Sequence, residues 1–592
     1  MTTPFTDASF QTALASLTSL APSSAGIEAL RRISAATDSD LVAFTAACLE
    51  HGVLDWLLRS LEYCGDADEP KRSMETLWVF TNLAVSSSGC TALLERGVAE
   101  KLCCVLHLGQ PDDIVENAIW TLGNIAGEGR AAVDSLVERG VFAHVSRFLA
   151  EVDADADADA QGFGSTGDTV QTNLMWTVSN FTRVKPPLPY ALLAPVVPLL
   201  ARCLQRFERN GLRSALVDVL WSLTYVFREE SEGVRFEDLI IVPKDKNSIL
   251  EGSVAPPGDG DIDFDNILSR VVRQLHGPKP TRTPALRLLG NVAALEGGGG
   301  AAFFTSAVVA HLRRLAEQLD PDEMATVKEL AWLVSNLLAD CQETAACVLV
   351  GDVLSALIPQ APVLQRDGNP KSGEWSVGTE ISWVLANAMD DVATGGVDGG
   401  RGAVAQLLLG AGALEYCAQA IAAAATLKEP PPSGQLGRFM QAVAEIIRVG
   451  DTSPDPAVLT EGARPRNEAL AVFLAADGHS ALLELLEDSK VRVTMTAWEE
   501  TMQLVHLVMG IIGDFGVPQD VLARQNRFAE ANAQARGGGN NHGDNDAAEE
   551  EDEDGDEDRD GEGEDGEGES EDKDDGEIDS EDGEDNDHDD SE

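Results

Sequence analysis

The chain has 592 residues, of which 44% are hydrophobic, and a formal net charge of −57 at pH 7. So acidic a surface repels nucleic acid and anionic membranes, which excludes both as direct partners and favours basic proteins or peptides. Neither an amino-terminal signal pattern nor a run of about 18 uninterrupted apolar residues occurs, so we expect a soluble protein of the cytoplasm and nucleus. We also expect it to be a monomer.

Residues 1–66 come first, and their apolar spacing predicts helices punctuated by glycine, a degenerate opening repeat. The chain then repeats a pair in which a Trp is followed four residues later by Asn or Tyr. Six pairs occur in succession, namely Trp78/Asn82, Trp120/Asn124, Trp176/Asn180, Trp221/Tyr225, Trp332/Asn336 and Trp383/Asn387. A related segment, Arg287 to Asn291 in "PALRLLGNVAAL", divides the longest gap. The spacing predicts a repeat of about 42 residues with insertions, and therefore one elongated solenoid.

The residues around each Trp indicate how the repeats pack. Mostly apolar side chains stand one residue before, two after and five after the Trp, as Leu77, Phe80 and Leu83 do around Trp78. That spacing forms one stripe of an α-helix, and Trp and Asn share a neighbouring stripe. Because the apolar stripe packs against adjacent repeats, we expect the Trp/Asn pairs to form a ladder on one surface of an all-α solenoid.

Three insertions with loop composition are expected within the ladder region of residues 67–425. They are "DADADADAQGFGSTGD" at 153–168, Glu229 to Asp265, and "QRDGNPKSGEWS" at 365–376.

The carboxyl-terminal part lacks the Trp/Asn pair. Residues 426–520 contain helical segments, as expected of capping repeats. From 525 to 592 we expect an acidic, disordered tail, because a segment with low apolar content and a high density of like charge cannot form a hydrophobic core. Residues 544–592 alone hold 31 acidic residues against Arg559 and Lys573.

No motif of catalysis or metal binding accompanies the ladder. A nucleophile motif, a phosphate-binding glycine loop and a catalytic acid pair are all missing, and the histidines are not at metal-ligand spacing. The "DADADADA" segment lacks the Gly and terminal Glu of a calcium-binding EF-hand loop. We therefore expect neither an enzyme nor a bound metal or cofactor.

A ladder of Trp and Asn has its own binding chemistry. An Asn side chain offers an acceptor and two donors, so it can hold the backbone of an extended peptide whatever that peptide's sequence. Indole rings repeated along a surface form slots for the methylene stems of Lys or Arg, each with a cation–π attraction of about 0.5–2 kcal/mol. The ladder therefore predicts a groove for basic peptides.

The segments "IWTLGNIAGEG", "MWTVSNFTRVKPPLP", "LWSLTYVF", "PALRLLGNV" and "AWLVSNLLAD" resemble armadillo repeats of importin α, the receptor for nuclear localisation signals. The order of variants is also similar, since Tyr225 replaces Asn and Arg287 replaces Trp where the family has these changes. The resemblance covers about residues 67–425, and more weakly reaches about 515. It implies a right-handed superhelical armadillo solenoid, with a degenerate armadillo repeat in residues 1–66.

The resemblance also implies two sites for signal peptides. The major site would contain Trp78, Asn82, Thr91, Trp120, Asn124, Gly127, Glu128, Trp176 and Asn180. The minor site would contain Asp218, Trp221, Tyr225, Arg287, Asn291, Glu329, Trp332, Asn336, Glu380, Trp383 and Asn387. Glu128 stands where the family has Asp, and its carboxylate would meet the central lysine of the signal. Arg183 and Lys185, between the two sites, also match the family.

The amino-terminal segment before the first ladder pair departs from importin α, which begins with a long basic arm that binds importin-β and, when free, occupies the groove. Among the first 70 residues only Arg31, Arg32 and Arg59 are basic, so we expect the arm to be missing. Two functions remain open. One is an adaptor that binds basic nuclear localisation signals of cargo for import, with importin-β and an export receptor as further partners. The other is an armadillo chaperone or scaffold for basic nuclear proteins that no longer cycles with importin-β.

Overall fold

The computed structural model describes the helical part of the chain. The described residues are 10, 14, 24–34, 38–62, 69–159, 167–228, 267–294, 306–320, 322–339, 349–365, 368–389, 398–427, 431–432, 434–449, 467–487 and 498–515. All of them belong to the first of the chain's two units, which are residues 1–530 and 531–592. The predicted disordered tail therefore lies outside the described residues.

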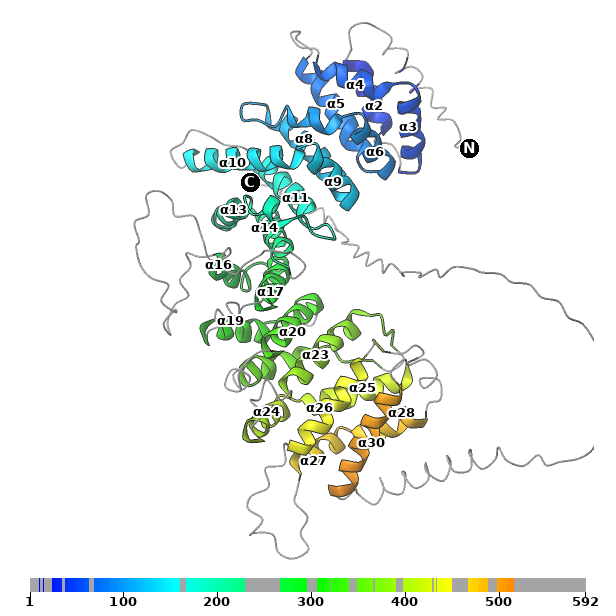
Figure 1. The fold of residues 1–592 in the computed structure, drawn as a ribbon, viewed down its shortest axis with the longest axis vertical. Coiled ribbons are helices and arrows are strands. Elements are labelled where there is room, and N and C mark those ends of the chain that lie inside the picture. The colour runs from blue at the N-terminus through cyan, green and yellow to red at the C-terminus, as the bar shows by residue number, and fades with distance from the viewer. Residues whose placement is uncertain are drawn as a thin grey trace, which may run out of the picture. The chain divides into compact units, whose positions relative to one another are not determined.

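Every regular element in these ranges is helical, which confirms the all-α fold class (Figure 1). One set of helices forms a continuous column in which each member packs on the next. The column contains α2 (Ser24–Ser34), α5 (Glu69–Leu83), α8 (Asp112–Gly127), α11 (Asp168–Thr182), α14 (Arg213–Val226), α17 (Lys279–Ala294), α20 (Met324–Ala339), α23 (Gly373–Ala388), α26 (Gln435–Val449) and α30 (Trp498–Phe515).

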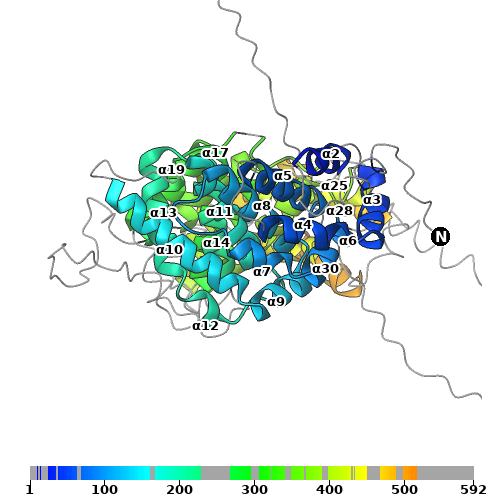
Figure 2. The ribbon, with the colours of Figure 1, turned by 90° about the horizontal axis from the view of Figure 1, so that it is seen from above.

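The other helices flank the column, and α7, α9 and α10 lie to one side of α8 and α11 when the stack is viewed end on (Figure 2). They are α3 (Asp38–Glu50), α4 (Val53–Glu62), α6 (Ser87–Glu95), α7 (Val98–Cys103), α9 (Arg130–Glu138), α10 (Val141–Asp159), α12 (Tyr190–Leu193), α13 (Val197–Asn210), α16 (Ile267–Gln274), α19 (Ser306–Glu317), η1 (Leu349–Leu354), α22 (Ser355–Leu357), η2 (Ile358–Gln360), α24 (Asp398–Gly410), α25 (Ala413–Thr426), α27 (Glu468–Ala475) and α28 (Gly478–Glu487).

The repeating unit is a group of three helices, such as α6, α7 and α8 or α9, α10 and α11, and the fold is an armadillo-repeat solenoid. Its core is the apolar stripe expected from the sequence: Ile119, Leu122 and Ile125 on α8 are fully buried. None of the described helices is by itself long and apolar enough to cross a bilayer. By length and composition, only the bent pair Gly402–Gly410 and Ala413–Thr426 passes that test among the described helices.

The structure corrects two of the three expected insertions. The predicted loop at 153–168 is wrong at its start, because α10 continues to Asp159. Buried Asp153 anchors this extension to α13 by accepting from Arg202 Nε at 2.5 Å and from Arg206 Nη1 at 2.8 Å. The predicted loop at 365–376 is wrong at its end, where α23 begins at Gly373 and Trp375 is only 2% exposed in the core. The insertion at 229–265 lies outside the described residues.

Candidate functional site

The six Trp/Asn or Trp/Tyr pairs all lie on helices of the column. Trp120 and Trp383 are 38% and 45% exposed, and the other four ladder tryptophans are half-buried. Two tryptophans outside the ladder behave differently, since Trp56 and Trp375 are buried in the core. The column therefore keeps its tryptophans within reach of a ligand, although full burial would stabilise the fold more.

The ladder asparagines join successive repeats. Asn180 Nδ2 donates to the backbone carbonyl of Gly123 at 3.1 Å, and Gly123 directly precedes Asn124, the ladder Asn of the previous repeat. The same bond recurs from Asn291 to Thr224 at 3.0 Å, from Asn336 to Gly290 at 3.3 Å and from Asn387 to Ser335 at 3.0 Å. Each of these amides thus uses a donor for the fold and keeps its Oδ1 for a ligand. Asn180 is the most enclosed of them, at 4% exposure.

The residue directly before each ladder Asn or Tyr is small. In two repeats this residue is a glycine, and the Trp of the next repeat lies against it. A Cβ on Gly123 would stand 2.3 Å from Cζ3 of Trp176, and a Cβ on Gly290 would stand 2.1 Å from Cζ3 of Trp332. Both distances are far below the 3.4–4 Å of ordinary contact. These two glycines are therefore seats that let an indole ring rest on the backbone of the preceding helix.

The amino-terminal part of the column, which we call the N-terminal ladder, carries Trp78, Trp120 and Trp176 on α5, α8 and α11. The Trp78 and Trp120 rings meet edge to face, with centroids 6.4 Å apart at an interplanar angle of 62°. A lysine stem inserted between these two rings would have to part them. Among the described residues, no guanidinium stacks on any of the three rings.

The polar residues predicted beside the N-terminal ladder lie at helix ends. Glu128, which follows α8, and Thr91 on α6 are both exposed, and Thr91 Oγ1 donates to the Ser87 carbonyl at 2.9 Å. Arg183 at the end of α11 donates from Nη2 to the Gly127 carbonyl at 3.1 Å. The Glu128 carboxylate is therefore accessible to a cation, whereas the Gly127 carbonyl is already engaged.

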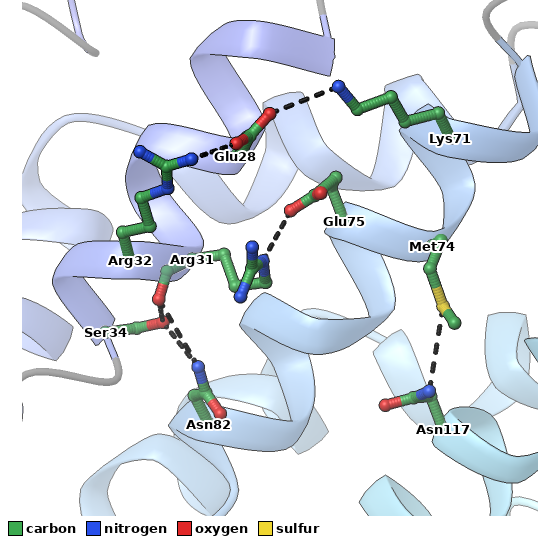
Figure 3. A network of polar contacts seen from close by, with 9 residues as sticks. All are labelled: Glu28, Arg31, Arg32, Ser34, Lys71, Met74, Glu75, Asn82 and Asn117. Carbon is green, nitrogen blue, oxygen red and sulfur yellow. Dashed lines mark hydrogen bonds and ion pairs between the residues drawn. The ribbon is translucent and has the colours of Figure 1, made fainter. Parts of the chain in front are cut away.

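The column begins one helix earlier than the ladder, at α2 (Figure 3). Arg31 Nε pairs with Glu75 at 2.6 Å, and Asn82 Nδ2 donates to Ser34 Oγ at 2.8 Å. Asn117, one turn before Trp120, is only 4% exposed and faces Met74, with its Nδ2 donating to the Asp113 carbonyl. Asn117 is therefore part of the packing between α5 and α8.

In the middle of the column, the aromatic pair is stacked on itself and has an arginine beside it. Tyr225 stacks on Trp221 with centroids 5.5 Å apart at 18°, and the Arg228 guanidinium lies 6.0 Å from the Tyr225 ring centroid. One turn before Trp221, burial raises the pKa of Asp218 to about 7. This segment separates the N-terminal ladder from the C-terminal ladder, by which we mean Arg287, Trp332 and Trp383 on α17, α20 and α23.

In the C-terminal ladder, two arginines cover the tryptophans. The Arg287 guanidinium lies 4.7 Å from the ring centroid of Trp332 and pairs with Glu329. The Arg438 guanidinium lies 4.0 Å from the ring centroid of Trp383. Burial raises the pKa of the Glu329 carboxyl, with Arg287 opposing that shift, and burial also raises the pKa of the Glu380 carboxyl.

The structure thus brings the predicted major-site residues together on α5 to α11 and the predicted minor-site residues together on α14 to α23. Sequence reasoning missed the pairing of Arg31 with Glu75, the stacking of Arg438 on Trp383 and the two glycine seats. A usable signal was present for the seats, since Thr81, Gly123, Ser179, Thr224, Gly290 and Ser335 are all small. Among the described residues, no group of three His, Cys, Asp or Glu side chains gathers to hold a metal ion.

Comparison with known proteins identifies distant relatives. No protein-family model matches the chain. Importin subunit alpha-2 of Arabidopsis thaliana is 26% identical over 198 residues, which cover 33% of this chain and 32% of that protein. Importin subunit alpha-1a of Oryza sativa subsp. japonica is 25% identical over 307 residues, covering 51% and 49% respectively. The chain thus matches about a third of the length of the first relative and about half of the second, and it is a distant homologue of importin α subunits.

A solved structure supports the fold. The crystal structure of an engineered protein superposes with a TM-score of 0.57 at 16% sequence identity, covering 86% of this chain and 100% of that one. At that identity, the likeness concerns the arrangement of helices alone.

Proposed function

We propose that the chain is an adaptor that binds lysine- and arginine-rich nuclear localisation signals of other proteins in the N-terminal ladder and serves their import into the nucleus. The observation that carries the proposal is the row of accessible indole rings on α5, α8 and α11 of an acidic protein. Core packing does not require an exposed Trp120, whereas a cation–π platform does. The distant homology to importin α subunits supports the same function.

The proposed binding mode follows from the side chains. The stems of Lys or Arg would lie against Trp120 and Trp176, and the carboxylate of Glu128 would receive the head of the central lysine. The Oδ1 atoms of Asn82 and Asn180 would accept from the peptide backbone, because each amide already directs an Nδ2–H into the fold. Recognition would therefore depend on the spacing of basic residues more than on the identity of their neighbours.

Calorimetric titration with a single-cluster basic peptide tests the proposal. Trp120→Ala combined with Trp176→Ala removes two cation–π contacts, so we expect weakening by roughly 5- to several hundred-fold. Trp332→Ala combined with Trp383→Ala is the matched control and should change this affinity less than twofold. A peptide whose lysines are replaced by glutamine should not bind.

Equal losses from the two double variants would reject the N-terminal ladder as the site. Because truncating Trp176 also empties its seat on Gly123, thermal unfolding of each variant must be compared first. Trp120→Leu with Trp176→Leu keeps apolar contact while removing the π-face, and it should weaken binding to a similar extent.

The acidic segment 544–592 favours a second candidate function, a chaperone or scaffold for long basic proteins. Titrating the chain and its bound peptide with importin-β distinguishes the two. An adaptor should form a ternary complex with importin-β, whereas a chaperone should hold its basic client without importin-β joining.

A further inference from the structure

Arg438 belongs to α26, the column helix that follows the last ladder tryptophan. Its register is set by the core: Met440, Val443 and Ile446 are fully buried, so Gln441 stands where the preceding column helices carry Trp. Arg438 therefore lies one turn before Gln441, the residue that takes the place of the ladder Trp on this helix. On α20 and α23 the same register holds Glu329 and Glu380. Where the two preceding helices present a carboxylate, α26 presents a guanidinium.

The structure around Arg438 holds that guanidinium against Trp383. Its Cζ lies 4.0 Å from the ring centroid, and its Nε donates to Ser382 Oγ at 2.9 Å. Gly434, at φ +71°, leaves the space for the head group, because a Cβ there would stand 2.8 Å from Arg438 Nη1. The position of the Arg438 side chain is thus defined by its stacking on the indole face, by its hydrogen bond to Ser382 and by the space left at Gly434.

The carboxylates of the C-terminal ladder are also matched to cations of this chain. Glu329 pairs with Arg287, and Glu380 lies within the electrostatic reach of Lys328 and Arg438. A basic residue from outside would therefore find a guanidinium of this chain already stacked on each indole and a positive charge beside each carboxylate. To enter the slot at Trp383, it would have to displace Arg438.

We propose that Arg438 is a built-in occupant of the Trp383 slot and prevents a second basic cluster from adding to a ligand's affinity for the column. This inference rests on the proposed function, because it assumes that basic peptides are the ligands of the ladder. Displacement exchanges one cation–π contact for another of similar strength, so a second basic cluster gains almost nothing. The N-terminal ladder, whose rings no described guanidinium covers, then binds the single cluster without competition.

The test compares two peptides that share one basic cluster, of which only one carries a second cluster after a flexible, uncharged Gly/Ser linker. With the natural chain, we expect their Kd values to agree within about twofold. With Arg438→Ala, the two-cluster peptide should bind about 3- to 10-fold more tightly than the single-cluster peptide, because the Trp383 slot is free to contribute. Arg448→Ala on the same helix is the matched control, since Arg448 is exposed and pairs with Glu445 on its own helix.

Two outcomes would overturn the proposal. The natural chain could already prefer the two-cluster peptide by tenfold or more, or Arg438→Ala could leave the ratio of the two Kd values unchanged. Thermal unfolding of each variant shows whether it is folded. Arg438→Gln, which keeps the length of the side chain without its charge, should raise the ratio in the same direction as Arg438→Ala.

A second measurement separates this inference from the proposed function. In protein labelled with 5-fluorotryptophan, the Trp383 resonance is assigned by its loss in Trp383→Phe. Arg438→Ala should shift that resonance and enlarge its solvent isotope shift, whereas Arg448→Ala should not. An unchanged Trp383 resonance in Arg438→Ala overturns the occupancy, whereas failure of both peptides to bind overturns only the proposed function and the ratio of Kd values predicted from it.

Discussion

Gly123→Ala is the most informative single change, because two effects of known size oppose each other. Gly123 lies inside α8, where replacing Gly by Ala favours the helix by about 1 kcal/mol. The new Cβ, however, would stand 2.3 Å from Cζ3 of Trp176 and 2.6 Å from Oγ1 of Thr177, against the 3.4–4 Å of ordinary contact. Inserting a methyl group into such a packed position destabilises by about 1–3 kcal/mol.

We therefore expect Gly123→Ala to lower the free energy of unfolding by a net amount of about 1 kcal/mol. The effect on binding should be larger, because the Trp176 ring must leave its seat. Loss of one cation–π contact of about 0.5–2 kcal/mol corresponds to an affinity roughly 2- to 30-fold weaker for a single-cluster basic peptide. Gly290→Ala displaces Trp332 in the same way and should leave the affinity for that peptide unchanged.

Gly510→Ala provides the matched control, since Gly510 lies inside α30 and a Cβ added to it would have no atom within 4 Å. Only helix propensity operates there, so the variant should be as stable as the natural chain or up to about 1 kcal/mol more stable. Chemical denaturation midpoints and calorimetric titration measure both properties. If Gly123→Ala gains as much stability as Gly510→Ala and binds the peptide normally, the seating of Trp176 on Gly123 is wrong.

Three further predictions concern charge. Asp218→Asn should raise the melting temperature more at pH 8 than at pH 5. The folded pKa of about 7 lies above the ordinary 3.8, so the natural chain loses about 3 kcal/mol of stability as pH rises from 5 to 8. Equal gains at both pH values would contradict this. Glu128→Arg should weaken the binding of a basic peptide at least about tenfold and leave the melting temperature unchanged, since Glu128 is exposed. Normal binding would remove Glu128 from the site. Deleting residues 537–592 should slow stopped-flow association with a histone-sized basic protein and flatten the salt dependence of that rate, leaving the affinity for a short peptide unchanged. Identical rates would reduce the tail to a solubility role.

The sequence by itself determined the fold class and the positions of the ladder pairs. Both follow from local periodicity: the apolar stripe at Ile119, Leu122 and Ile125 fixes which face of α8 is buried, and Trp120 and Asn124 then fall on a neighbouring stripe. The same rule applies wherever the pair recurs, because helical geometry depends only on residues a few positions apart. The division of the ladder at Tyr225 and Arg287 was likewise visible as a change of residue type.

Only the tertiary structure decided what each ladder tryptophan contacts. Trp383 is stacked with Arg438 of the following column helix, and Trp176 rests on Gly123 of the preceding one. The extension of α10 past Asp153 also depends on a partner in another repeat, Arg206. Contacts of this kind arise when column helices stack, and no local pattern of charge or hydropathy specifies them, because a guanidinium on a helix surface is equally compatible with solvent, a carboxylate or an indole face.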